Sequence, residues 1–235
     1  MIVLCAILLD AMAAAAVPPP SDAPDVLAVV DHIVYATPDL DLGIQKLETL
    51  LGVRAAPGGQ HPGRGTRNAL IALKTGRYLE IIGPDLEQPK PSAPRTFGID
   101  DLRESRLVAW AAKAANLERL ASDAKGRGVA LGDVASGSRR RPDGVLLSWR
   151  YTTPQAALAL AGGVVPFFID WGTTPHPSET AAGGCGLVAL RAEHPEVERV
   201  ARLLQQLGVP LSVRSGPRPA LVATVDCPRG RVELR

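Results

Sequence analysis

The sequence has little of what would place the protein in several functional classes. It has three cysteines in 235 residues, 4% aromatic residues and a formal net charge of +2 from 26 basic and 24 acidic side chains. Charges so nearly balanced provide no basic stripe for the phosphate backbone of a nucleic acid. GxGxxG turns and Walker A motifs are also absent, which disfavours the phosphate-cradling folds. We therefore expect no nucleic-acid partner.

The few cysteines are odd in number and far apart, at Cys5, Cys185 and Cys227. This spacing indicates neither a disulfide framework nor a CxxC metal clip. We therefore expect reduced thiols in a cytosol-like compartment.

Long apolar runs are missing too. The strongest, Met1 to Leu9, is too short to span a bilayer and is followed by Asp10. It lacks the basic region of a secretory signal, although Ala13 to Ala16 would suit a cleavage site. We expect residues 1–27 to form a tail outside the fold, and the protein to be cytoplasmic and independent of membranes. An organellar or secreted location stays open.

What the sequence does contain is one pattern three times: an apolar strand, a turn, an amphipathic helix that ends near glycine, and two or three strands. The units cover about residues 29–83, 105–172 and 185–235. The first and third helices end in LETLLGV and LLQQLGV, which suggests duplication. Such units predict an α+β fold with mixed sheets, in a domain of residues 28–235.

Local patterns predict several details of these units. Leu47, Leu50 and Leu51 are spaced for one face of the first helix, which Gly52 is placed to end. Asn116 is the expected N-cap of the second helix. The inward face of the third helix is predicted to contain Val200, Leu203, Leu204 and Leu207. Two connections are predicted as loops: residues 84–105, with four prolines, and a solvated turn around Arg139, Arg140 and Arg141.

Two polar residues in predicted strands are candidates for chemistry. Glu80 lies inside the apolar run from Tyr78 to Ile82, and a carboxylate that faces a core needs a hydrogen-bond partner or a metal ion. His32 follows Asp31 at a strand start. It is either a buried histidine bonded to a backbone carbonyl or a ligand.

Loop residues are candidates for substrate contacts. A glycine-rich segment carries His61, Arg64, Arg67 and Asn68. Its glycines permit close backbone approach, and arginine with asparagine suits a carboxylate or a carbonyl. A flexible hairpin with solvated arginines is the alternative. His176 follows Trp171 soon after a strand end, where loops tend to line clefts, although His-Pro pairs are also common in turns. Trp171 is expected in the core or in a cleft wall.

Residues 30–85 contain Asp31 and His32, GGQHPGRGTRNALI at 58–71 and YLEIIG at 78–83. Through these motifs the segment resembles the opening module of glyoxalase-like proteins of the vicinal oxygen chelate superfamily. It continues more weakly through RTFGIDDL, RRRPDGVLLSW and PFFIDWGTTPHPS. The resemblance implies two βαβββ modules that pair into a cleft, where the first and fourth strands bind one divalent ion. It thus implies His32 and Glu80 as ligands of Zn, Fe, Mn or Ni.

The later units depart from this pattern. Leu107 stands where a second histidine is expected, and Ile169 stands opposite Glu80. Asp170 is one place off and so should face the other side of its strand. In the third unit Glu233 aligns with Glu80. The ligand set is therefore incomplete, and Glu233 or Asp170 are candidates for the base.

The resemblance implies a lyase, isomerase or dioxygenase in which a divalent ion chelates neighbouring oxygens of a small substrate while a carboxylate, Glu80 or Glu233, moves a proton. The alternative is a metal-free protein of the same fold that binds or sequesters a small ligand. An interaction module with a degenerate site is a third interpretation. The expected partners are the small molecule and, as an option, a second copy of the chain in a homodimer.

Overall fold

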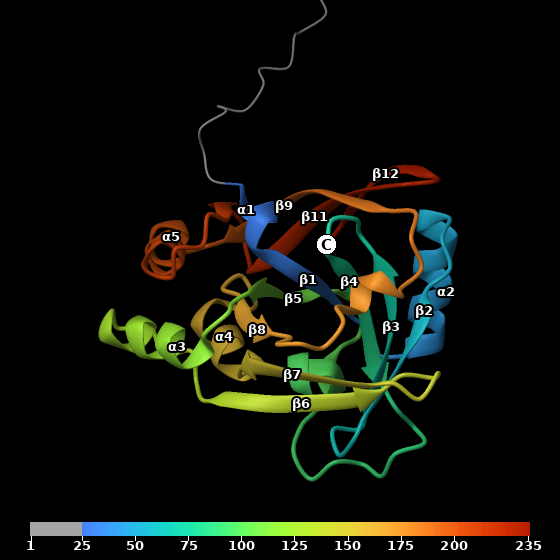
Figure 1. Cartoon of the computed structure of the whole chain (residues 1–235). Helices are drawn as coiled ribbons and strands as arrows, with labels where there is room; N and C mark the ends of the chain where they lie inside the picture. The colour runs from blue at the N-terminus through green and yellow to red at the C-terminus, as the bar shows by residue number, and fades with distance from the viewer. Residues whose placement is uncertain (1–24) are drawn as a thin grey trace, which may run out of the picture.

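The computed structural model describes residues 25–235 and contains two β-sheets with helices packed against them (Figure 1). The strands of the larger sheet are β1 Val30–Ala36, β2 Ala56–His61, β3 Thr66–Ala72, β4 Tyr78–Pro84, β5 Arg106–Lys113, β6 Val134–Arg140, β7 Leu146–Thr152 and β8 Phe167–Asp170. The smaller sheet contains β9 Gly186–His194, β10 Ser212–Ser215, β11 Ala220–Cys227 and β12 Gly230–Leu234. The α-helices are α1 Val26–Val29, α2 Leu40–Leu51, α3 Leu117–Gly126, α4 Pro154–Ala161 and α5 Val197–Gln206. Two 3-10 helices are η1 Thr96–Asp101 and η2 Pro177–Glu179.

The first two units of the sequence share one pairing pattern in the larger sheet, whose strand order is β2-β3-β4-β1-β5-β8-β7-β6. The first strand of each unit lies parallel to its last strand, β1 to β4 and β5 to β8. β1 and β5 pair antiparallel at the centre of the sheet. The two units therefore form symmetric halves of a curled sheet, and the predicted α+β fold of βαβββ modules is confirmed.

The third unit has the predicted element order but a different pairing. The order of its sheet is β10-β9-β11-β12, and β9 lies parallel to β10, the strand directly after the helix. In the first unit the parallel neighbour is the last strand. The similar helix ends have a local cause, because Gly52 and Gly208 both adopt a left-handed conformation with φ of 74° and 67°. The similar sequences LETLLGV and LLQQLGV therefore reflect the same way of ending a helix. They do not predict the same strand pairing.

The main apolar core lies between the two sheets. The smaller sheet covers one face of β1 and β5 (Figure 1), and residues from both sheets belong to one buried cluster. Trp110 of β5 is fully buried there, and its Nε1 donates to Val164 O at 2.8 Å. Successive residues of a strand face opposite sides, so Ile33 of β1 faces this core while His32 faces the inside of the curl. The same strand therefore supplies both the core and the site.

The helices only partly match the predicted faces. Asn116 caps α3 as predicted, accepting from Arg119 N at 3.0 Å, and Val200 and Leu204 of α5 are buried. The inward position predicted for Leu50 is wrong, since that side chain is 42% exposed. α2 begins at Leu40 and packs through the row of Leu40, Gly43, Leu47 and Leu51, which leaves Leu50 beside the buried face.

Three elements were not predicted as strands or helices: β2, β6 and α4. The solvated turn predicted for residues 139–141 is wrong for Arg139, which is 3% exposed within β6, whereas Arg140 is exposed and Arg141 begins a turn. All seven residues of β6 pair with β7, and Arg139 Nη1 donates to Gly58 O on β2. Gly59, at φ 139°, approaches so closely that a Cβ would lie 2.5 Å from Arg140 O. The edge strands β2 and β6 therefore meet, which closes the curl.

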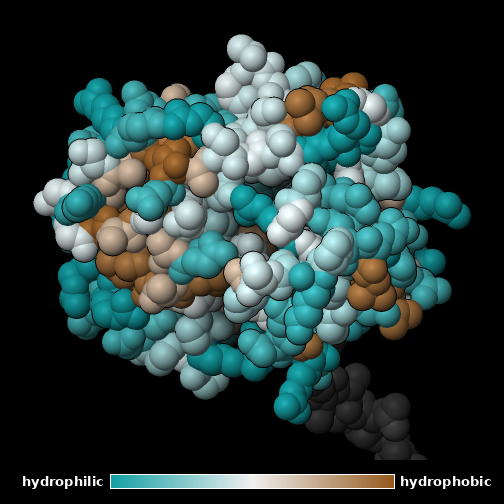
Figure 2. Space-filling view, turned by 90° about the horizontal axis from the view of Figure 1, so that it is seen from below, coloured by the Kyte–Doolittle hydropathy of each residue, from teal (hydrophilic) through white to brown (hydrophobic). Residues whose placement is uncertain are grey.

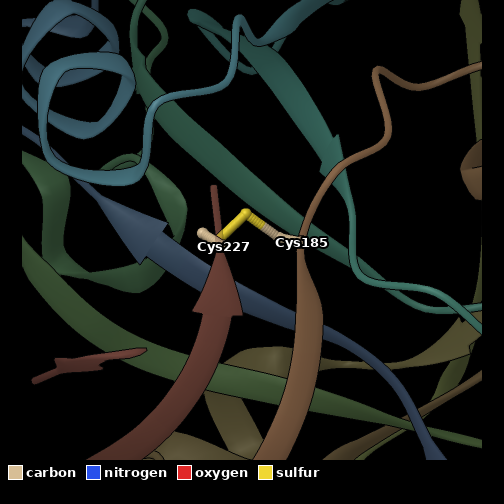
Figure 3. Close-up of a disulfide and its surroundings, with 2 residues drawn as sticks. All are labelled: Cys185 and Cys227. Atoms are coloured by element: carbon tan, nitrogen blue, oxygen red, sulfur yellow. A yellow bond between two sulfur atoms is a disulfide. The ribbon is translucent and has the colours of Figure 1, made fainter. Parts of the chain in front are cut away.

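The smaller sheet carries a disulfide between Cys185 and Cys227 (Figure 3). The prediction of reduced thiols is therefore wrong for these two residues, while Cys5 lies outside the described residues. β9 and β11 are antiparallel with Gly186 opposite Asp226, so the flanking cysteines face each other with Cα atoms 4.2 Å apart. The pairing follows from a strand register that cysteine spacing does not contain.

The described chain begins at Asp25, so the predicted tail boundary at residue 28 falls within α1. The apolar run and cleavage-site pattern lie outside the described residues. Within residues 25–235, no helix is both long and apolar enough to cross a membrane. Figure 2 shows a mostly hydrophilic to neutral face, with apolar residues gathered on the side where α4 lies. The homodimer stays a prediction.

Candidate functional site

A cavity of about 260 Å³ lies inside the curl of the larger sheet. Its first wall comes from unit one and is polar, with His32, His61, Arg64, Asn68 and Glu80. Its second wall comes from unit two and is mainly aromatic and apolar, with Trp149, Tyr151, Phe167, Ile169 and Trp171. Arg139 and Ser138 of β6 lie where the two walls meet. We call these the polar wall and the apolar wall.

A β-bulge in β1 sets the geometry of His32. Val30 pairs with Ala112 and His32 with Ala111, so Asp31 is the extra residue. A bulge re-aims side chains, and here the Asp31 carboxylate lies beside the next side chain, with Oδ1 2.7 Å from His32 Nδ1. In neutral His32 this bond places the proton on Nδ1. The lone pair of Nε2 is thereby left for the cavity.

Asp31 is 1% exposed and is held by three donors. Besides His32, Trp171 Nε1 donates to it at 3.3 Å, and His176 Nε2 lies 3.1 Å from Oδ2. Burial alone would raise the pKa of Asp31, but the hydrogen bonds from His176 and His32 and their charges outweigh burial and lower it well below its usual range. The carboxylate therefore stays ionised and ties the segment after β8 to β1.

Glu80 lies on β4 beside His32. Its Oε1 accepts from Asn68 Nδ2 at 2.6 Å, and its Oε2 lies 3.8 Å from His32 Nε2. Within residues 25–235 neither Oε2 nor His32 Nε2 has a hydrogen-bond partner. Tyr78 stacks on the His32 ring, with centroids 4.5 Å apart, and so fixes its plane. Two lone pairs thus face one space from side chains that are otherwise held.

His61 completes the polar wall at the end of β2. Its Nδ1 lies 2.9 Å from Thr66 Oγ1, and its Nε2 lies 3.3 Å from Asn68 Nδ2 and 3.9 Å from Glu80 Oε1. Burial is the main cause that lowers the pKa of His61 to about 4, and the charges of Arg139 and Arg64 add to it against Glu80. His61 is therefore neutral near pH 7.

The structure brings most of the predicted site residues together, but not all. Arg67 points away from the cavity and pairs with Asp41 at 2.9 Å. Glu233 is exposed on β12 in the smaller sheet, where it pairs with Arg191 and Arg235. The third unit pairs its strands differently, so alignment with Glu80 does not bring Glu233 to the cavity. Asp170, as its offset predicts, is not among the lining residues, whereas Ile169 is.

His176 does not line the cavity. It contacts Asp31, which in turn holds His32. Sequence reasoning missed Arg139, Tyr78 and Tyr151 as lining residues. Tyr78 could have been found, because it precedes Glu80 by two residues and so shares its face of β4. Arg139 gave no such signal, since the sequence of β6, VASGSRR, has no apolar alternation.

His32 Nε2 and Glu80 Oε2 are the atoms that could hold a divalent ion. Their 3.8 Å separation is close to the roughly 3.4 Å between two ligands that each lie about 2.1 Å from one tetrahedral ion. Asp31 behind His32 matches the carboxylate that commonly supports a ligating histidine. In the described part of the chain no group of three or more His, Cys, Asp or Glu side chains is arranged around a metal position. His32 and Glu80 could therefore fill two coordination positions of a divalent ion.

Comparisons with known proteins identify the fold family. The sequence model of the glyoxalase-like domain matches residues 30–208. No curated protein matches the chain. A hypothetical protein from Staphylococcus aureus shares the fold at a TM-score of 0.55 and 12% identity, over 87% of this chain and 83% of that chain.

Two further structures are similar at lower TM-scores. Methylmalonyl-CoA epimerase from Mycobacterium tuberculosis has 19% identity and a TM-score of 0.42, over 64% of this chain and 92% of that chain. A hypothetical protein from Bacillus halodurans C-125 has 17% identity and a TM-score of 0.42, over 62% of this chain and 96% of that chain. Because the family model covers most of the sequence and its paired βαβββ modules, this chain belongs to the glyoxalase-like domain family of the vicinal oxygen chelate superfamily.

Proposed function

We propose that the protein is an enzyme that acts on a small oxygen-rich molecule with a divalent metal ion held by His32 and Glu80. The proposal rests on the two lone pairs of Nε2 and Oε2, which face the cavity 3.8 Å apart without a protein partner among residues 25–235. Each belongs to a side chain whose other polar atom is fixed by a buried hydrogen bond, to Asp31 or from Asn68. Preorganised donors of this kind are typical of metal sites.

The protein residues divide the work as follows. A bound divalent ion supplies a Lewis acid that polarises a substrate oxygen. Asp31 holds the His32 ring and its tautomer, and Asn68 orients the Glu80 carboxylate. Glu80 is the only carboxylate among the lining residues of the described chain, so it is also the group that moves a substrate proton. Lyase and isomerase chemistry fit these roles, whereas dioxygenase chemistry would also need a redox-active ion such as Fe.

Metal analysis of protein purified without a histidine tag tests the proposal. We expect one ion per chain in the wild type and none in His32→Ala or Glu80→Ala. Arg67→Gln is the matched control, because Arg67 faces away from the cavity. The proposal fails if the wild type carries no ion and gains no thermal stability from Zn, Mn, Fe or Ni.

A metal-free binding protein is the second candidate, and the apolar wall favours it. Phe167 and Ile169 face the cavity from β8, in the half of the sheet that mirrors β4 and Glu80. Such a wall suits a hydrocarbon surface and supplies no ligand to an ion. Ligand binding that is equally tight before and after treatment with a chelator supports this candidate.

We also infer that the protein works in an oxidising compartment rather than in the cytoplasm that cysteine spacing predicts. The Cys185–Cys227 disulfide supports this inference, because such bonds persist in oxidising compartments and are rare in the cytosol. Alkylation of free thiols during cell lysis tests it. Two additional alkylated cysteines in the native protein would contradict it.

A further inference from the structure

The cavity contains two guanidinium groups that no carboxylate of residues 25–235 pairs with. Arg139 is 3% exposed, and its bond to Gly58 O is its only hydrogen bond within that range. Arg64 donates to the Tyr151 hydroxyl and lies over that ring at 5.4 Å. Every arginine that forms an ion pair with a carboxylate within residues 25–235 is one other than Arg64 and Arg139.

An unpaired buried charge needs an explanation, because removing a charge from water is unfavourable unless a partner compensates. Burial accordingly lowers the pKa of Arg139, although the charges of Tyr78 and Glu80 oppose this shift. A guanidinium presents several N–H donors in a rigid fork, and the described chain uses only one of them. The bond to Gly58 accounts for the closure of the sheet. It leaves the other donors of Arg139 without a role.

The two arginines act on the same part of the cavity. Arg139 Nη1 donates to Gly58 O on β2, and Arg64 N donates to His61 O at the end of the same strand. Both arginines therefore line the cavity beside β2. Among the charged lining residues they stand against one carboxylate, that of Glu80. In the ion-free protein, one additional negative charge would balance these charged side chains. A phosphate monoester, with a charge of roughly −1.5 to −2, would exceed that balance.

The remaining lining limits the rest of the ligand. Trp149, Phe167 and Ile169 offer a hydrocarbon surface across from the polar wall. The volume of about 260 Å³ lies below the roughly 300–1,000 Å³ that is typical of pockets for drug-sized molecules. The ligand must therefore be small and amphipathic.

We infer that Arg64 and Arg139 bind the carboxylate of a small organic acid whose hydrocarbon part lies on the apolar wall. A carboxylate suits the fork geometry of a guanidinium, which binds it through two parallel hydrogen bonds. The inference rests on the proposed function, since it names the substrate class for the same cavity. It concerns different residues from those that hold the ion.

Calorimetric titration of chelator-treated protein tests the inference. The probes are phenylacetate, benzoate, isovalerate and lactate, each paired with its amide, and phenyl phosphate. We expect at least one acid to bind about tenfold tighter than its amide and tighter than phenyl phosphate. Failure of every acid to exceed its amide overturns the inference.

Three variants assign the binding to these residues. Arg139→Gln should weaken the acid about 10- to 100-fold, as expected for the loss of charge-assisted hydrogen bonds. Arg140→Gln is the matched control: Arg140 is the next residue on β6, it is exposed, and it donates to Gly144 O. Because Arg139→Gln could also open the sheet, Arg64→Gln provides an independent test and should weaken binding about tenfold. Unchanged affinity in Arg64→Gln overturns the inference.

The same titrations separate this inference from the proposed function. If His32→Ala loses the ion but still binds the acid, the arginines hold the carboxylate as inferred. If the wild type binds the acid without ever holding an ion, the inference stands and the metal-dependent function fails. If binding requires the ion and survives Arg139→Gln, the carboxylate sits on the ion, and the inference alone fails.

Discussion

The two walls of the cavity come from units with the same strand pairing, and yet they carry opposite chemistry. In the first unit β1 and β4 direct His32 and Glu80 inward, whereas β8 of the second unit directs Phe167 and Ile169 inward. Both units pair their first and last strands in parallel, so the backbone does not account for the difference. The two units share a backbone arrangement, and the individual side chains on it determine the chemistry of each wall.

The walls also differ in how they tolerate change. The polar wall depends on a buried network, and Asn68 Oδ1 is its weak point, as the one buried side-chain polar atom without a partner in residues 25–235. At Phe167 and Ile169 the apolar wall needs only shape, which packing with neighbours supplies. Substitutions that exchange the character of the walls should therefore have the largest effects.

Placing a carboxylate on the apolar wall should have the largest effect. Ile169→Glu puts a charge at a side chain that is 3% exposed and faces aromatic neighbours. Without a metal ion we expect a loss of about 3–5 kcal/mol in the free energy of unfolding, measured in urea with a chelator present. Ile169→Val is the control, with a loss of about 0.5–1.5 kcal/mol. A loss below about 1 kcal/mol for Ile169→Glu would show that water reaches this wall and solvates the introduced carboxylate.

The polar wall should make stability depend on pH. The pKa of His61 is about 4 in the folded protein, whereas an unperturbed histidine, which represents the unfolded chain, has a pKa of 6.5. As pH falls, the unfolded chain therefore binds the proton first. The contribution of His61 is complete above pH 6.5 and is lost between pH 6.5 and 4, by up to about 3 kcal/mol.

Urea unfolding between pH 7.5 and 4.5 checks this dependence. His61→Gln should remove most of the slope. His194→Gln is the comparison variant: burial also lowers the pKa of His194, which lies outside the cavity, but less than that of His61, so this variant should remove a smaller part of the slope. Equal slopes in His61→Gln and the wild type would contradict the assignment.

The support behind the polar wall should have a smaller effect. Asp31→Asn replaces the carboxylate, which only accepts and so keeps the proton of His32 on Nδ1, with an amide that can either accept from Nδ1 or donate to it. We expect about 10- to 100-fold weaker binding of Zn in a competition titration. Nitrogen NMR of the His32 ring should show a mixture of tautomers in the variant and one tautomer in the wild type. An unchanged tautomer would show that Asp31 does not set the position of the His32 proton.

A change that keeps the apolar wall apolar should have the smallest effect. Phe167 is 5% exposed and meets the His32 ring edge-on at 5.5 Å. Phe167→Leu should lower the free energy of unfolding by about 1 kcal/mol and leave the metal content unchanged. Loss of the ion in this variant would mean that packing, as well as Asp31, positions His32.

Local patterns were enough to predict the frame and the residues of the polar wall. Periodicity located β1, β4, α2, α3 and α5, and the carboxylate in an apolar strand pointed to Glu80. The one-residue offset also placed Asp170 on the other face correctly, because alternation along a strand is a local property.

The rest depends on which strands become neighbours. Arg139 is buried because β2 and β6 meet, and its own sequence resembles a surface segment. Glu233 aligns with Glu80, but β9 takes β10 as its parallel neighbour. The disulfide follows from the register of β9 and β11. All three features depend on which strands pair over long distances in the sequence. Local patterns in a single sequence do not specify those pairings.

The disulfide turns part of the third unit into a closed covalent ring. The ring runs from Cys185 through β9, α5, β10 and β11 to Cys227, a separation of 42 residues. A protease that cuts one bond between these residues leaves a single covalent molecule, which separates into two chains only after reduction. The surface helix α5 can therefore be nicked without release of β12, whose pairing with β11 holds the end of the chain on the smaller sheet.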